Sequence, residues 1–329
     1  MSISEIAKHL NVSKSTVSLV INGKAEKSRI SKVLTKRVLD YIEEIGYKPN
    51  ALAKSLATGK SRTIGLIVEN IGDSFFGPIA LYIEEYLRKY EYQVLYSSTM
   101  GNNKLAAEII QTMIDKQVDG LILAPTDHIE KEVKRIVDSN TPIVLFDRKI
   151  LGIDANYVGT NNYEASSTAI QHLLEQGYRN IGMVTINSQQ PQMQDRLQAY
   201  LTTLDQHTLK PHVCLTSFSE KKEHGWKEIR EWLDKNTHLD ALYFSTNYLC
   251  VMGIKALQNL QNERQLAFIT FDDHEIFELV QPPVSCIRQP LEKIAKSIVH
   301  MLMTQLTAKE KCIAEDIIPS ELQIRKSSL

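Results

Sequence analysis

The sequence predicts an all-α N-terminal segment, followed by an α/β body of two doubly wound, parallel-sheet lobes. Three observations support this prediction. Apolar residues recur at helical spacing in three stretches of residues 2–45. From Arg62 onward, apolar runs alternate with amphipathic stretches in two successive series. Charge also divides the chain, with 12 Lys and Arg against 5 Asp and Glu in residues 1–62, and 26 against 34 in the remainder.

The first two helices are expected between Ser2 and Asn22. Ser2 precedes Glu5 by three residues, which is the spacing of a capping box. Asn11 suits a left-handed turn, and Ser13 is placed to cap a second helix. Two short helices joined by a tight turn are typical of a helix-turn-helix, whose second helix presents polar side chains to a DNA major groove. An ordinary helical hairpin with a solvated polar face is the alternative on these residues alone.

A third helix is expected over residues 31–45, with Gly46 ending it. Its expected apolar face comprises Val33, Leu34, Val38, Tyr41, Ile42 and Ile45. Residues 47–60 could form a further short helix that starts at Pro49 and ends at Gly59. Because so short a helix is marginal in water, we expect it to order only against a partner.

The N-terminal excess of positive charge predicts a polyanionic partner for that segment only. No apolar run approaches the roughly 18 residues that span a bilayer, and the polar N-terminus does not match a signal peptide. We therefore expect a cytoplasmic protein without a membrane partner. The four cysteines are far apart in the sequence, which predicts buried, reduced thiols and no zinc site; they are Cys214, Cys250, Cys286 and Cys312.

The N-terminal motifs resemble the DNA-binding headpiece and hinge of the lactose-repressor family. The resemblance covers nearly all of residues 2–60. It rests on Ser-Glu-Ile-Ala-Lys-x-x-x-Val-Ser-Lys-Ser-Thr-Val-Ser over residues 4–18, on Asn22, on Gly-Tyr-Lys-Pro-Asn over residues 46–50, and on Leu56.

The resemblance implies roles for the second helix. Lys14, Ser15 and Leu19 would face base edges in the major groove. Leu19 stands where Arg is frequent in the family, so its contact would be apolar, for example to a thymine methyl. Phosphate contacts would come from Ser13, Thr16, Ser18 and Asn22, with Arg29 and Lys36 as weaker candidates.

The resemblance also implies roles for the hinge. Leu56 would enter a central minor-groove step and bend the duplex, with Ala53 packed alongside and Asn50 as a further DNA contact. A near-palindromic, double-stranded operator and a homodimer are expected, because one short headpiece buries too little surface for specificity. The tail after Gln323 has no heptad pattern, which favours a dimer over a tetramer.

In the body, nearly all expected strands are apolar along their whole length, as in parallel sheets covered on both faces. The first series has strands at residues 63–69, 93–98, 120–125 and 142–147 and helices at residues 78–90, 104–116 and 130–139. The second series has helices at residues 164–176, 192–204, 225–235 and 249–258 and strands at residues 181–185, 213–218, 241–245 and 267–271. Two such series predict two similar doubly wound lobes.

The body resembles the periplasmic sugar-binding-protein fold, which the lactose-repressor family uses as its effector domain. In that family the chain crosses between the lobes three times, and we expect the crossings near Asn161, Gln289 and Pro319. The expected domains are a headpiece over residues 1–46, a hinge helix over 47–60, and an effector-binding and dimerisation domain over 61–329. The first lobe would comprise residues 61–160 and 290–318, and the second lobe residues 161–289 and 319–329.

Polar and aromatic residues gather where the expected strands end. Ligands of doubly wound folds bind beyond the carboxyl ends of the strands, so we expect a site between the two lobes. Carboxylates and amides accept hydrogen bonds from hydroxyls, Arg donates to sugar oxygens, and Phe rings cover the apolar face of a sugar. The candidates for binding a small neutral carbohydrate effector are Asp73, Phe75, Phe76, Asp147, Arg148, Arg196, Asn247, Asp272 and Gln289. The resemblance agrees, since all of these except Asp73 match sugar-contact positions of ribose-binding-like members of the superfamily.

Each candidate has a structural alternative. These are core packing for Phe75 and Phe76, a surface ion pair for Asp147 and Arg148, and a structural salt bridge for Arg196 and Asp272. Three departures from the family pattern leave the ligand open: Tyr248 and Asn161 stand where Asp is common, and Ala199 stands where Gly is common.

We therefore expect an effector-controlled transcriptional regulator that acts as a repressor. A simple sugar-binding protein is one alternative, which the headpiece and the missing signal peptide disfavour. The other is a regulator of the same fold that has lost its small-ligand response and answers to a protein partner or a sugar phosphate. No hydrolase, phosphate-loop or metal motif is present, so we expect no enzyme activity, cofactor or metal. His274, beside Asp272 and Asp273, is expected to be a surface or ligand-shell residue.

Overall fold

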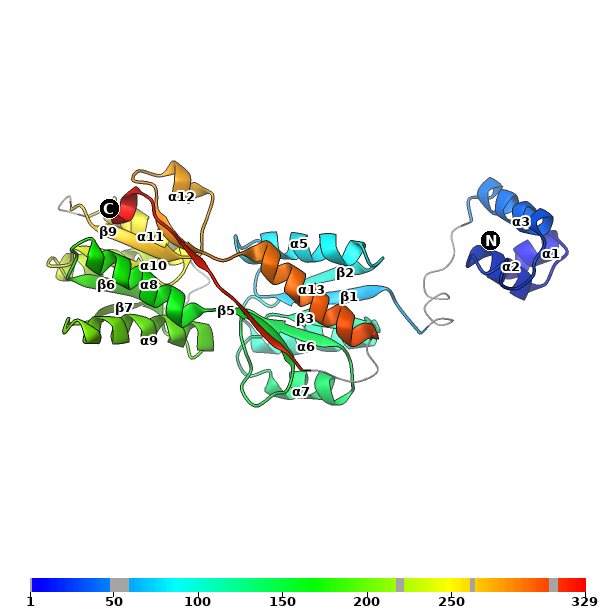
Figure 1. The fold of residues 1–329 in the computed structure, drawn as a ribbon, viewed down its shortest axis with the longest axis horizontal. Coiled ribbons are helices and arrows are strands. Elements are labelled where there is room, and N and C mark those ends of the chain that lie inside the picture. Colours follow the sequence, from blue (N-terminus) through cyan, green and yellow to red (C-terminus); the bar gives the residue numbers. More distant parts are fainter. Residues whose placement is uncertain (1, 48–58, 217–221, 261–263, 308–312) are drawn as a thin grey trace. The chain divides into compact units, whose positions relative to one another are not determined.

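The computed structural model describes residues 2–47, 59–216, 222–260, 264–307 and 313–329 (Figure 1). The chain divides into two compact units, Met1–Ser61 and Arg62–Leu329. Most of the expected hinge helix, including Asn50, Ala53 and Leu56, lies outside the described residues.

Three helices form the first unit, and the expected caps Ser2 and Ser13 begin the first two of them. They are α1 (Ile3–His9), α2 (Lys14–Ile21) and α3 (Lys32–Glu44). The capping box is present, since the backbone N–H of Ser2 donates to Glu5 Oε2 at 2.6 Å and that of Glu5 donates to Ser2 Oγ at 3.3 Å. Ser13 Oγ accepts from the backbone N–H of Thr16 at 3.0 Å. Asn11 has the expected left-handed conformation, with φ of 50°.

The core of the first unit differs from expectation in α3. Its buried side chains are those of Ile6, Ala7, Val17, Val20, Ala25 and Val38. Val33, expected on the apolar face of α3, is 81% exposed, whereas Leu34 packs against the core. Successive helical residues point about 100° apart, so only one of these neighbours can face α1 and α2.

The first lobe of the second unit is a six-stranded parallel sheet with helices on both faces. The strand order is β11-β5-β4-β3-β1-β2. The strands are β1 (Thr63–Val68), β2 (Gln93–Ser98), β3 (Gly120–Leu123), β4 (Ile143–Phe146), β5 (Asn156–Thr160) and β11 (Glu315–Ile318). Helices α5 (Phe76–Arg88) and α13 (Leu291–Thr307) cover one face, and α6 (Asn103–Asp115) and α7 (Glu130–Asp138) cover the other.

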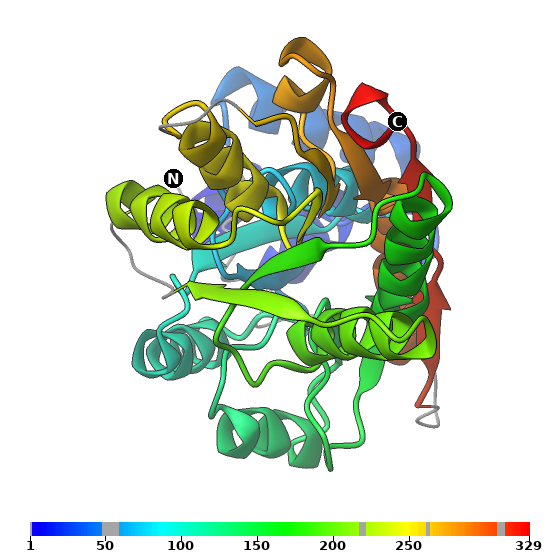
Figure 2. The same ribbon diagram turned by 90° about the vertical axis from the view of Figure 1, so that its left-hand side faces the viewer.

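The second lobe repeats this architecture with the strand order β12-β10-β9-β8-β6-β7. The strands are β6 (Ile181–Ile186), β7 (His212–Thr216), β8 (Ala241–Phe244), β9 (Ala267–Phe271), β10 (Ser285–Arg288) and β12 (Glu321–Gln323). Helices α8 (Asn162–Glu175) and α9 (Pro191–Gln206) cover one face, and α10 (Lys222–Lys235) and α11 (Asn247–Leu257) cover the other (Figure 2). The short helices α12 (Ile276–Leu279) and η1 (Lys326–Ser328) complete the lobe. The expectation of a wholly parallel sheet is wrong for this lobe, because β12 runs antiparallel to β10.

Several elements were not expected from the sequence. They are β5, α12, β10, α13, β11, β12 and η1. β11 and β12 are partly exposed and mix apolar with polar residues, so they show no apolar run. β5 contains only two apolar side chains that a strand favours, Tyr157 and Val158.

The chain passes between the two sheets three times. The crossings are at Asn161 between β5 and α8, at residues 289–290 between β10 and α13, and at residues 319–320 between β11 and β12. Figure 1 shows the C-terminal segment, in red, running from one sheet to the other. The first and third crossings are hydrogen-bonded to each other, because the backbone N–H of Ser320 donates to Asn161 Oδ1 at 2.8 Å.

Three of the four cysteines, Cys214, Cys250 and Cys286, are buried free thiols as expected, and Cys312 lies outside the described residues. Burial raises the pKa of the Cys214 thiol to about 12. Among the described residues, no helix is long and apolar enough to cross a membrane. The described part of the chain also holds no group of three or more His, Cys, Asp or Glu side chains arranged for a metal ion.

Candidate functional site

The exposed face of α2 carries most of the residues expected to contact DNA. Lys14, Ser15 and Asn22 are exposed, whereas Thr16, Ser18 and Leu19 are half-buried; Arg29 and Lys36 are exposed as well. Ser13 Oγ lies 2.7 Å from Ser15 Oγ and 2.8 Å from Thr16 Oγ1. A helix N-terminus that carries hydroxyls and a lysine is suited to binding a phosphate.

Asn22 ends the same helix. Its Nδ2 donates to the backbone oxygen of Ser18 at 2.8 Å, and its own backbone N–H bonds the same oxygen at 3.0 Å. The Ser18 carbonyl therefore accepts from both the backbone and the side chain of Asn22, which adds a side-chain hydrogen bond to the end of the helix. Asn22 therefore has a structural role at the helix end in addition to the phosphate contact expected for it.

In the second unit, two aspartates occupy the same place in the two lobes. Asp147 directly follows β4 and Asp272 directly follows β9. Both have left-handed backbones, with φ of 64° and 66°. This conformation is uncommon outside glycine, and Asp is among the residues that tolerate it best. The two carboxylates are close enough for the charge of Asp272 to raise the pKa of Asp147.

Arg148 lies beside Asp147 and is almost fully buried. Its Nη2 donates to Glu69 Oε2, its Nη1 donates to the backbone oxygen of Pro125 at 3.2 Å, and its Nε lies 3.3 Å from Asp147 Oδ2. Burial raises the pKa of Asp147 to about 6, although the positive charges of Arg148 and Arg196 oppose this rise. The guanidinium of Arg148 is thus shared between two carboxylates of the protein.

Arg196 is the corresponding cation of the second lobe. From α9 it donates through Nε to Asn162 Oδ1 at 2.9 Å and through Nη1 to the backbone oxygen of Ser245 at 2.7 Å. Its Nη1 lies 3.7 Å from Asp272 Oδ2, and its guanidinium stacks 3.5 Å from the centroid of the Phe271 ring. Burial raises the pKa of Asp272, while Arg196 and a hydrogen bond from Gln289 act in the opposite direction.

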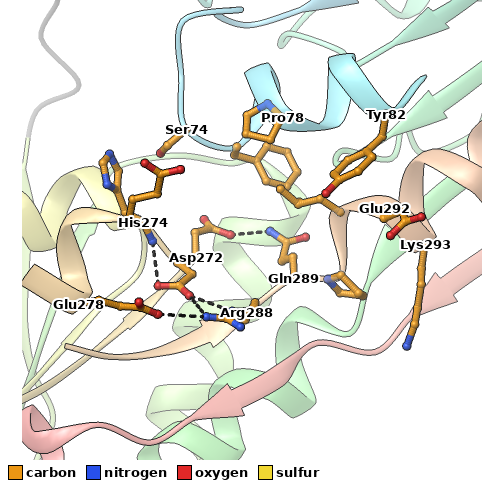
Figure 3. Close-up of a pocket in the computed structure, with 15 residues that line it drawn as sticks. Ser74, Pro78, Tyr82, Asp272, His274, Glu278, Arg288, Gln289, Glu292 and Lys293 are labelled. Carbon is orange, nitrogen blue, oxygen red and sulfur yellow. Dashed lines mark hydrogen bonds and ion pairs between the residues drawn. The ribbon is translucent and has the colours of Figure 1, made fainter. Parts of the chain in front are cut away.

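Two contacts connect this cluster to the space between the lobes. Asn247 Nδ2, at the start of α11, donates to Ser74 Oγ of the first lobe at 2.8 Å. Gln289, at the second crossing, donates through Nε2 to Asp272 Oδ1 at 2.6 Å (Figure 3). Both amide side chains therefore lie where the two lobes meet.

A cavity of about 740 Å³ adjoins the cluster (Figure 3). Its walls come from the loop and helix after β1, from the segment after β9, and from the second crossing, so both lobes line it. Its lining includes Phe75, Asp272 and Gln289 together with the aromatic ring of Tyr82 and the side chain of His274. The volume lies in the range typical of small-molecule sites.

Beside the cavity, Asp273 is the centre of an ion-pair network. Arg288 Nε and Nη2 donate to Asp273 Oδ2 at 2.8 and 2.6 Å, and Arg325 donates to both oxygens of the same carboxylate at 3.0 Å. Arg325 also bonds Glu278 at 2.9 Å. Burial opposes ionisation here, but the hydrogen bonds from Arg325 and Arg288 lower the pKa of Asp273 to about 2.

The structure brings most of the expected effector residues together. Those that form one connected group are Asp147, Arg148, Arg196, Asp272 and Gln289. Asn247 contacts Ser74 of the first lobe instead. Asp73 lies near the group because its charge raises the pKa of Asp272, and its carboxylate accepts from the backbone N–H of Phe75 at 2.8 Å. Both phenylalanines belong to the first-lobe core, as the structural alternative expected; Phe75 also lines the cavity, and the Phe76 ring lies 6.2 Å from that of Phe146.

Three residues of the cluster were missed by sequence reasoning. Asn162 and Ser245 are the partners of Arg196, and Glu69 is the partner of Arg148. Glu69 directly follows β1 and Ser245 directly follows β8, so position at a strand end was a signal that could have identified both. Asn162 begins α8 and carried no such signal.

Several buried polar atoms at these strand ends have no hydrogen-bond partner within the described parts of the chain. They are Thr99 Oγ1, Thr126 Oγ1, Arg148 Nε, Gln192 Oε1 and Ser245 Oγ. Thr99 and Ser245 directly follow β2 and β8, and Gln192 lies at the start of α9. Because buried polar groups in folded proteins are almost always paired, their concentration here indicates a site for a polar ligand.

Comparison with known proteins identifies both units. The family profile described as bacterial regulatory proteins, lacI family, matches residues 2–50, and the one described as periplasmic binding protein domain matches residues 64–310. The chain is 30% identical over 308 residues to the ribose operon repressor of Haemophilus influenzae, covering 92% of this chain and 91% of that protein.

Solved structures show the same fold. A LacI family transcriptional regulator from Silicibacter pomeroyi superposes with a TM-score of 0.81 at 18% identity, covering 99% of this chain and 98% of that one. The Cra transcriptional dual regulator from Pseudomonas putida, in complex with fructose 1-phosphate, has a TM-score of 0.75 at 20% identity and covers 80% of this chain and 99% of that one. The chain therefore belongs to the lacI family of bacterial regulatory proteins, with a periplasmic binding protein domain as its second unit.

Proposed function

We propose that the chain is a transcriptional repressor whose operator affinity is controlled by a small carbohydrate bound between its two lobes. The headpiece would comprise residues 1–46, the hinge residues 47–60, and the effector and dimerisation domain residues 61–329. The observation that carries the effector assignment is the convergence of buried polar side chains, several without a partner, at the strand ends of both lobes. We assign no catalytic activity and no cofactor.

A carbohydrate suits this cluster chemically. Its hydroxyls can donate to the carboxylates of Asp147 and Asp272 and accept from the guanidinium groups of Arg148 and Arg196. Phe75, in the wall of the adjoining cavity, offers an apolar surface to the C–H face of a sugar ring. The ribose operon repressor named above is consistent with a sugar, and the Cra complex shows that the fold itself also accommodates a phosphorylated one.

For DNA, the support is the basic first unit and the exposed N-terminal part of α2. Lys14, Ser15 and Leu19 would contact base edges, and the neighbouring hydroxyls and Asn22 would hold phosphates. In the hinge, Leu56 would enter the minor groove of a near-palindromic operator, flanked by Asn50 and Ala53. We place this activity in the cytoplasm, where the DNA is.

Exposed apolar side chains support a homodimer. Leu81 on α5 is 58% exposed, and Ile276 and Leu279 at α12 are 41% and 79% exposed. Both helices contribute to the wall of the same cavity. Large exposed apolar side chains on these two helices are suited to burial against a second copy.

The test is a thermal-shift screen of the purified full-length protein against pentoses and hexoses, followed by operator binding with and without any ligand found. The operator would be selected from random duplex DNA. We expect one sugar to raise the melting temperature in proportion to occupancy and to change the affinity for the selected DNA. A protein that binds DNA but responds to no sugar would contradict the effector assignment, and one that selects no DNA sequence would contradict the repressor assignment.

A further inference from the structure

Glu69 changes the electrostatic character of the cluster. It directly follows β1, its side chain is 19% exposed, and its carboxylate accepts a hydrogen bond from Arg148 Nη2. The guanidinium also contacts the backbone oxygen of Pro125 and the carboxylate of Asp147. An incoming anion would therefore meet an arginine whose charge two carboxylates of the protein already balance.

The arginine of the second lobe is also already paired within the protein. Arg196 is engaged by Asn162, the backbone oxygen of Ser245 and the carboxylate of Asp272. The carboxylates also act on one another, since Asp272 and Glu69 raise the pKa of Asp147, and Asp73 raises that of Asp272. Four carboxylates thus accompany two guanidinium groups, and the cluster has no surplus of positive charge.

We propose that Glu69 is a specificity-determining residue that restricts the cleft to uncharged polyhydroxyl ligands and excludes their phosphate esters. This inference rests on the proposed binding of a carbohydrate between the lobes. A phosphate needs unpaired, preferably bidentate, guanidinium or ammonium donors. At Arg148, Glu69 occupies Nη2, and only Nε has no hydrogen-bond partner among the described residues. A bidentate contact must therefore displace Glu69, and the phosphate would then lie close to Asp147 in a poorly solvated site, where like charges repel strongly. Hydroxyl groups carry no such penalty, because each can donate to a carboxylate and accept from a guanidinium.

The test compares matched pairs of ligands on matched variants of the full-length protein. The ligands are ribose and ribose 5-phosphate, fructose and fructose 1-phosphate, glucose and glucose 6-phosphate, and inorganic phosphate. The variants are Glu69→Gln, which removes the charge but keeps a hydrogen-bonding side chain, and Glu69→Asp, which keeps the charge. Glu108→Gln, on the exposed face of α6 in the same lobe, makes the same charge change outside the cluster.

In the wild type, we expect a neutral sugar to bind and its phosphate ester to bind at least about tenfold more weakly. Glu69→Gln should reduce the ratio of neutral-sugar affinity to phosphate-ester affinity by about tenfold, and should let inorganic phosphate raise the melting temperature of the protein. Glu69→Asp and Glu108→Gln should keep the wild-type ratio. A wild type that prefers a phosphate ester, or a Glu69→Gln variant that behaves as Glu108→Gln does, would overturn the inference.

The result also separates this inference from the proposed function. If no carbohydrate, neutral or phosphorylated, binds the wild type, the carbohydrate assignment fails. Inorganic phosphate still tests Glu69 in that case, because stabilisation of Glu69→Gln but not of the wild type supports the role in anion exclusion, and equal behaviour refutes it.

Discussion

Replacing Arg196 with alanine tests the central cation of the second lobe. The change removes two hydrogen bonds from a charged donor, at 2.9 and 2.7 Å, and the ion pair with Asp272 at 3.7 Å. Hydrogen bonds to charged groups contribute about 1.5 to 3 kcal/mol each, and removing one partner of a buried ion pair costs about 3 to 5 kcal/mol. Because Asp272 can take up a proton, we expect a loss near the lower end, about 3 kcal/mol at pH 8.

Urea unfolding followed by tryptophan fluorescence suits this measurement. The chain has two tryptophans, Trp226 and Trp232, and both lie on α10 of the second lobe. The contacts of Arg196 described above lie in the same lobe, so the fluorescence reports on the part of the protein that the substitution changes. The loss should be smaller at pH 5.5 than at pH 8, because protonation relieves the unpaired carboxylate. Gln198→Ala, two residues away on the exposed side of α9, should change stability by no more than about 0.5 kcal/mol.

Arg196→Ala should also abolish the response to the sugar that raises the melting temperature of the wild type. Its operator affinity in the absence of sugar should be unchanged. A loss below about 1 kcal/mol, or one independent of pH, would refute the assignment of Arg196 as the buried counter-charge. An unchanged sugar titration would refute its place in the effector site.

Four further predictions concern other residues. Burial raises the pKa of Asp147 from 3.8 to about 6, so the folded protein binds more protons than the unfolded chain between these pH values. The free energy of unfolding should therefore rise by up to about 3 kcal/mol as the pH falls through this interval. Asp147→Asn should flatten the dependence of that free energy on pH, measured by urea unfolding between pH 7.5 and 4.5. Ser13→Ala removes the cap of α2 and should cost about 1 kcal/mol, seen as about fivefold faster hydrogen exchange in peptides covering that helix. Asp273→Asn removes the carboxylate that holds Arg288 and Arg325 beside the second and third crossings; it should leave sugar affinity within about threefold but abolish most of the sugar's effect on operator affinity. A retained effect would show that this network does not transmit sugar binding to the crossings. Operator affinity should fall steeply with salt, and Lys36→Ala should reduce the log–log slope by about one for each phosphate that the lysine neutralises, whereas an unchanged slope would remove Lys36 from the interface.

Much of the candidate site could be predicted because strand ends are local features of a sequence. Asp147 and Asp272 each directly follow a run of apolar residues, and parallel strands bring their carboxyl ends to one edge of a sheet. The partners of these residues could not be found in the same way. Asn162 and Ser245 are 34 and 49 residues from Arg196 in the chain, and only the packing of α8 and β8 against α9 brings them together with it.

Adjacent residues of similar type were also hard to separate. Phe75 and Phe76 stand at the start of α5 and both belong to the first-lobe core, but only Phe75 also lines the cavity. The segment after Phe271 gave no clear periodic signal in its strands, because β11 and β12 are short and partly exposed. The order of elements before that point depended on buried apolar runs and was correspondingly easier to predict.

The hydrogen bonds at the three crossings limit how the lobes can move. Asp273 holds Arg288, which precedes the second crossing, and Arg325, which follows the third, while Asn161 of the first crossing bonds Ser320 of the third. Because these hydrogen bonds join the three segments to one another, we expect the segments to move together where they enter the second lobe. Gln289 and Asp272 are the chain neighbours of Arg288 and Asp273. A ligand that binds to these two side chains would therefore act directly beside the joined crossings, and we expect its binding to change the angle between the two lobes.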